Sequence, residues 1–142
     1  MPSFNPDQTD IAEKVLEAVE ALVAENLPVE YEYLPADVKE LPCLMVSTIP
    51  GNPVEKEYVD GSYIANYRFG LLLRQSAEDS QARLDAIRIL RNIADDLCKS
   101  PPRLEGVEVW GLNKDNLPSR IATEEPYVDY QVTLTVQYKA HR

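Results

Sequence analysis

The spacing of hydrophobic positions changes several times along the chain, and two stretches carry a helical spacing. Across residues 7–26 apolar side chains recur every three or four positions, and Pro28 ends the pattern. Across residues 77–99 a second apolar stripe follows Ser76 and Asp79, which are spaced like a capping box. The sequence therefore predicts two amphipathic helices.

The remaining patterned segments are typical of β-strands. Residues 29–34 and 41–49 are short runs bounded by prolines, and the second run is apolar on both faces, which predicts a central place in a sheet. Residues 54–59 lead into Asp60-Gly61, a pair that favours a tight turn, so a projecting hairpin is expected. Its return arm continues as a long strand through residue 73. A short strand is predicted at 107–110, and the clearest alternation runs from 128 to 138.

Residues 111–126 have no period and are rich in Asn, Asp and Pro, which predicts one long loop. With the projecting hairpin counted apart, the order is helix, three strands, helix, two strands. We expect an α+β fold in which both helices pack on one face of a mostly antiparallel sheet. The 142 residues suit a single domain spanning 1–142, with flexible ends at 1–6 and 139–142.

Charge narrows the range of partners. Asp and Glu outnumber Lys and Arg by 24 to 14, giving a net charge of −10 that repels nucleic-acid phosphates and anionic membranes. Sequence-specific DNA binding and membrane association are therefore not expected. The first residues lack the basic start and apolar stretch of a signal peptide, which predicts a protein kept in the cytoplasm.

The sequence offers little catalytic chemistry. The only histidine, His141, stands next to the carboxyl terminus, and Cys43 and Cys98 form no CxxC motif. The five glycines match no phosphate-binding loop. We therefore predict no catalytic residue, no metal site and no cofactor, and the protein is not expected to be an enzyme. Abundant carboxylates leave one alternative open, an enzyme with a carboxylate-only site.

Aromatic composition points to interfaces. Eight Tyr and one Trp stand against two Phe, and Tyr and Trp combine large contact area with a polar group. The segments 52–62 and 111–126, with the aromatic residues that border them, are the candidate contact regions. The candidate interface residues in and beside these segments are Val54, Tyr58, Trp110, Leu112, Leu117, Arg120 and Tyr127.

The order of elements, with the runs Leu41-Pro42-Cys43-Leu44-Met45-Val46-Ser47 and Tyr67-Arg68-Phe69-Gly70-Leu71-Leu72-Leu73-Arg74 and the helix opening Ser76-Ala77-Glu78-Asp79, resembles the tail terminator or tail completion proteins of long-tailed phages. The resemblance implies a homo-oligomer, a hexameric ring that caps the tail tube. Its partners would be the tail tube protein and the head–tail connector protein, and DNA would pass through the ring. Such a protein assembles in the host cytoplasm and ends in the virion tail. Two alternatives remain: a head–tail connector component, and a small adaptor that acts as a monomer or dimer.

Overall fold

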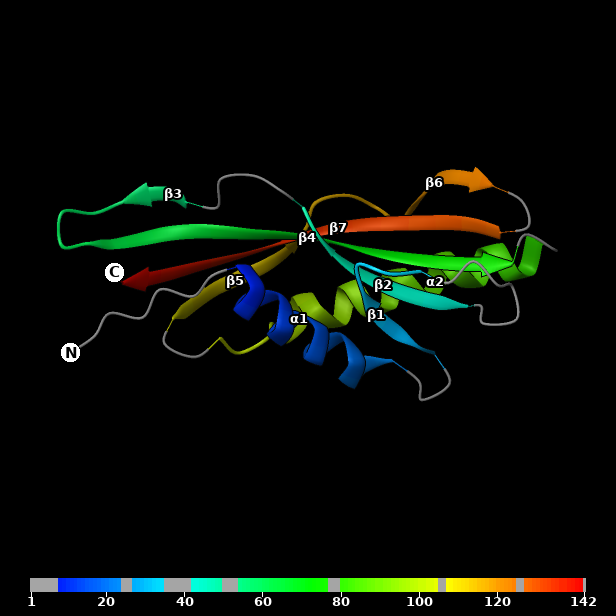
Figure 1. The fold of residues 1–142 in the computed structure, drawn as a ribbon, viewed down its shortest axis with the longest axis horizontal. Helices are drawn as coiled ribbons and strands as arrows, with labels where there is room; N and C mark the ends of the chain where they lie inside the picture. The colour runs from blue at the N-terminus through cyan, green and yellow to red at the C-terminus, as the bar shows by residue number, and fades with distance from the viewer. Residues whose placement is uncertain are drawn as a thin grey trace.

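Two long strands form the frame of the protein. β4 (Ser62–Ser76) and β7 (Tyr127–His141) are 15 residues each and pair antiparallel along their whole length (Figure 1). Apolar residues alternate with other residues along both strands, so one face of the pair packs on the core. The hydrophobic alternation predicted both strands, because burial of one face imposes a period of two.

The computed structural model describes residues 8–23, 27–34, 42–49, 54–76, 80–104, 107–124 and 127–141. The other elements are α1 (Gln8–Leu22), β1 (Val29–Tyr31), β2 (Cys43–Thr48), β3 (Val54–Glu57), α2 (Ser80–Lys99), β5 (Glu108–Lys114) and β6 (Ser119–Glu124). The predicted capping residue Asp79, the amino-terminal residues 1–6 and residue 142 lie outside the described residues. The capping role predicted for Ser76 was wrong, because Ser76 is the last residue of β4 and α2 begins at Ser80. No helix within these ranges has the length and apolar character needed to cross a bilayer.

The strands form one mixed sheet with the order β1-β2-β4-β7-β5, while β3 also pairs with β4 and β6 with β7. Only the short β1–β2 pair is parallel, and the other strand pairs are antiparallel. The predicted α+β class with a mostly antiparallel sheet is confirmed. The central place predicted for residues 41–49 was wrong, because β2 lies one strand away from the centre and β4 occupies it.

Both helices cover the same face of the sheet, as predicted (Figure 1). α1 packs beside β1 and β2, while α2 lies across β4, β7 and β5. Completely buried side chains such as Phe69 on β4 and Leu134 on β7 face the helices and sit directly opposite each other. Leu90 and Leu97 close the layer from α2, so the core lies between the helices and the sheet.

The opposite face of the sheet carries polar side chains that bond to one another. Glu55 accepts hydrogen bonds from the side-chain amides of Asn66 (3.0 Å) and Gln137 (2.8 Å), which link three neighbouring strands. Further along β7, Asn116 bonds to both the amide and the hydroxyl of Thr133. Bonds between polar side chains therefore link the strands on this face.

The predicted long loop at 111–126 was wrong. Residues 108–114 and 119–124 are the strands β5 and β6, and both pair with β7. Each pairing contains a register shift, between Val109 and Gly111 in β5 and between Arg120 and Thr123 in β6. Such bulges interrupt the alternation of apolar and polar residues by which a strand is recognised in a sequence. Residues 139–141, expected to be a flexible end, belong to β7 and pair with the start of β4.

Candidate functional site

The described residues contain no cluster of His, Cys, Asp and Glu that could hold a metal ion. Both cysteines lie in these ranges and form no disulfide: Cys43 is buried, and burial raises the pKa of the Cys98 thiol. Burial also raises the pKa values of Tyr67 and Tyr138 to about 12, which keeps both hydroxyls protonated. These groups serve packing, and the candidate contact sites lie on the surface.

The first surface feature is the tip of the β3–β4 hairpin, the end of the arm that extends to the left in Figure 1. The amide of Tyr58 donates to the carbonyl of Ser62 (2.8 Å), and the amide of Gly61 donates to the carbonyl of Tyr58 (3.0 Å). Gly61 has a φ of 89°, which a residue with a side chain adopts only with strain. Asp60 accepts from the amide and hydroxyl of Ser62, at 2.9 and 2.6 Å, so the turn is held from both sides.

At this tip Val59 is fully exposed, at 108% of its reference area. Tyr58, next to it, carries two ammonium groups over its ring, Lys56 at 5.2 Å and Lys139 at 5.4 Å from the ring centre. A cation above an aromatic face is attracted to the ring and limits its motion. The tip therefore presents one bare aliphatic side chain on an ordered turn.

The second feature is an open groove of about 510 Å³ where the chain leaves α2 and enters β5. Pro101, Pro102, Leu104 and Val109 supply apolar walls, and Trp110, 49% exposed, lies along it. Arg103 is the one charged residue in the described lining. An apolar trough beside an exposed Trp and a single cation is typical of a protein contact site.

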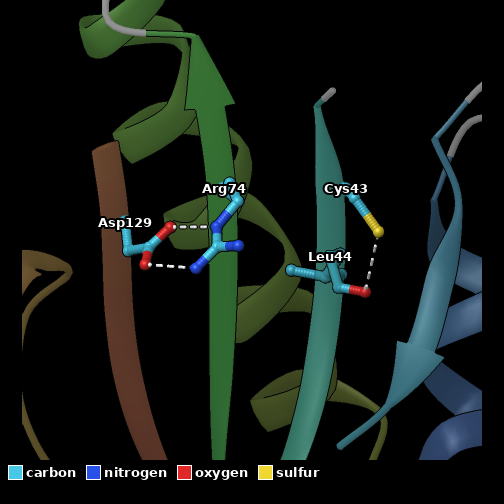
Figure 2. Close-up of polar contacts among 4 residues, drawn as sticks. All are labelled: Cys43, Leu44, Arg74 and Asp129. Carbon is cyan, nitrogen blue, oxygen red and sulfur yellow. Dashed lines mark hydrogen bonds and ion pairs between the residues drawn. The ribbon is translucent and has the colours of Figure 1, made fainter. Parts of the chain in front are cut away.

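A third feature is an ion pair between the two long strands. Arg74 on β4 donates two hydrogen bonds to the carboxylate of Asp129 on β7, from Nε to Oδ1 (2.8 Å) and from Nη2 to Oδ2 (3.0 Å) (Figure 2). Both side chains are largely buried, at 15% and 10% exposure. The guanidinium also lies 3.8 Å from the ring centre of Tyr127. Such a bidentate pair fixes the strands relative to each other and offers no reactive group.

Comparison with solved structures adds one informative match. The fold is similar to that of a chain in the virion of a native gene transfer agent particle. The TM-score is 0.53 and the identity 15%, over 95% of this chain and 94% of that chain. A second solved structure has 12% identity and a TM-score of 0.49 over 97% of this chain and 98% of its own. No protein-family model and no curated protein matches the sequence. At such low sequence identity, the structural likeness establishes the fold alone.

The structure distributes the seven candidate interface residues over different environments. Tyr58 lies at the hairpin tip and Trp110 in the groove, while Leu117 (73% exposed) and Arg120 lie on the β5–β6 side of the sheet. Leu112 is only 4% exposed, because it sits on the core side of β5 opposite Val136. It is therefore not available to a partner.

The two remaining candidates are partly covered. Val54 is half-buried and packs against the core, and Tyr127 lies beneath the guanidinium of Arg74. Sequence reasoning included Val59 only as part of the candidate segment 52–62 and did not include Arg103. Val59 carried a usable signal, since it directly precedes the Asp60-Gly61 turn, where a side chain has few neighbours. Arg103 carried no signal in the sequence, because its place in the groove depends on tertiary packing.

Proposed function

We infer that this chain is a structural subunit of a phage-like virion, and that it forms a ring which terminates the tail tube and joins it to the head-side connector. The observation that carries this proposal is the fold likeness to a chain of a gene transfer agent virion. The likeness extends over almost the whole of both chains. The likeness supports a virion role, and the ring-forming tail role rests on the resemblance of the element order to tail terminators.

The shape of the subunit suits a ring. A cyclic assembly needs two different surfaces on each subunit, one of which fits the other on the next copy. The sheet has unlike sides: β3 and the short β1 and β2 lie on one side of the β4–β7 pair, and β5 and β6 lie on the other. The hairpin tip and the groove of Trp110 belong to these opposite sides.

The charge of the chain also fits a channel for DNA. Six copies at −10 each carry a net charge of about −60. A negative lumen repels the phosphate backbone, so the genome slides through instead of adhering. A neutral or basic channel in the assembled ring would contradict this part of the proposal.

The decisive experiment is the solution mass of the purified protein by light scattering after size exclusion, at low and high concentration and in two salt concentrations, with electron microscopy of the same sample. We expect six times the subunit mass and rings with a central hole. A monomer or a two-fold dimer under all conditions would refute the ring and favour a small adaptor.

A second measurement separates the tail role from a neighbouring one. Purified rings are mixed with tail tubes in one reaction and with head-side connectors in another, and the complexes are examined by electron microscopy. Rings that cap the tube ends support tail termination. Rings that bind connectors and leave tubes uncapped would assign the chain to the head–tail connector instead.

A further inference from the structure

Val59 is a costly residue to leave bare on an isolated molecule. It is fully exposed at the end of an ordered turn, where the bonds around Asp60 and Gly61 hold it away from the rest of the sheet. A disordered loop could fold over an apolar residue, but this turn is fixed by its hydrogen bonds and by the lysines on Tyr58. The tip is thus preorganised, which lowers the entropic cost of inserting it into a partner.

The groove of Trp110 has the complementary character. Its walls are apolar, and its one cation, Arg103, is exposed and forms no ion pair with any described residue. The hairpin tip carries two exposed carboxylates, Glu57 and Asp60, on either side of Val59. The tip also carries Lys56 and Lys139 over Tyr58, so the charge match is local: the two carboxylates beside Val59 oppose the arginine of the apolar trough.

The tip cannot occupy the groove of its own subunit. β3 pairs with the outer side of β4, whereas the groove borders β5, and β4 and β7 lie between them in the sheet. The partner that brings the tip to the groove must be another molecule, and a second copy of this chain supplies both halves.

We propose that the hairpin tip of one copy inserts Val59 into the Trp110 groove of the next copy, with Glu57 and Asp60 facing Arg103. This inference rests on the proposed ring and deepens it by assigning the two halves of the subunit contact. Because the two halves lie on opposite sides of the sheet, the contact is head-to-tail, and repetition either closes a ring or builds a filament.

Cysteine cross-linking tests the contact directly. In a Cys98→Ser background, Val59→Cys is combined with Gly111→Cys, since Gly111 lines the groove and an added side-chain carbon there meets no atom within 4 Å. Oxidation should give a ladder of covalent multimers ending at the closed ring. A mixture of the two single variants should stop at dimers. The matched control pairs Val59→Cys with Leu84→Cys, another exposed position outside the groove, and should give no ladder.

Association measurements provide a second readout. Val59→Asp should raise the concentration for half-assembly roughly ten- to a hundredfold, because a buried aliphatic side chain is lost and a charge is placed in the trough. Leu84→Asp, at an exposed position on α2, should leave it unchanged. Arg103→Glu should weaken assembly, and Glu57→Lys added to it should restore much of the loss. Circular dichroism confirms that each variant is folded.

The outcomes separate this inference from the proposed function. If the wild-type protein forms no ring, both fail, and that is seen before any variant is made. If wild-type rings form while Val59→Asp assembles normally and the cysteine pair gives no ladder, only the tip-in-groove contact is overturned. A ladder together with the charge-swap rescue supports the contact.

Discussion

The ion pair of Arg74 and Asp129 allows the most quantitative test of how the long strands are held together. Replacing Asp129 with Ala removes two charge-assisted hydrogen bonds and leaves the guanidinium in a largely buried place. Removing one partner of a fully buried pair costs about 3–5 kcal/mol. Since these side chains are 15% and 10% exposed and water can reach the guanidinium in part, we expect a smaller loss, about 2–3 kcal/mol.

The assay is urea unfolding followed by circular dichroism at one fixed protein concentration, because self-association changes apparent stability. Asp129→Ala is measured against the wild-type protein, and Arg74→Met and Asp129→Leu are measured singly and together. The double variant should recover most of the single losses, since an apolar pair of similar size replaces the ion pair, giving a coupling of roughly 2 kcal/mol. Single losses below about 0.5 kcal/mol that simply add in the double variant would refute the argument.

Three further predictions concern the turn, the core and pH. Gly61→Ala should cost about 1–2 kcal/mol in urea unfolding because of the φ of 89°, whereas Gly111→Ala should cost little; equal effects would contradict the turn argument. Leu134→Ala should cost about 2–5 kcal/mol and Leu117→Ala less than about 0.5 kcal/mol, and a reversed order would place the core elsewhere. The raised pKa values of Tyr67 and Tyr138, about 12, mean that folding favours the protonated hydroxyls. Stability should therefore fall as pH rises from about 10 toward 12, as followed by urea midpoints and tyrosinate absorbance, and a flat profile in this window would contradict the burial of these hydroxyls.

Local patterns predicted the parts of the fold in which each residue's environment follows from its neighbours in the chain. The helix face with Leu90 and Leu97, the alternation through Phe69 and the turn at Gly61 were all readable. The sheet beyond β7 was readable only in part: the strand predicted at 107–110 is the start of β5, whereas its continuation to Lys114 and the strand β6 were not predicted. β5 and β6 carry polar residues on short edge segments with bulges, so their strand character depends on the hydrogen bonds that β7 provides.

The candidate contact residues were also predictable from the sequence only in part. Tyr58 and Trp110 were proposed from residue type and position, and the structure places one on the tip and the other in the groove. The exposure of Leu112 was misjudged, because the register between β5 and β7 decides which side of β5 faces the core. The order of strands in the sheet decides how Arg103 and the hairpin tip lie relative to each other.

By itself, the sequence determined two helices, the long strands, the projecting hairpin and the excess negative charge, because periodicity, turn chemistry and composition act over short stretches of chain. The tertiary structure alone decided that 111–126 adds strands to the sheet, that Arg74 meets Asp129 across 55 positions, and that the hairpin tip and the Trp110 groove lie on opposite sides. These features depend on which distant segments pair and in which register. That choice is made by packing the whole core at once.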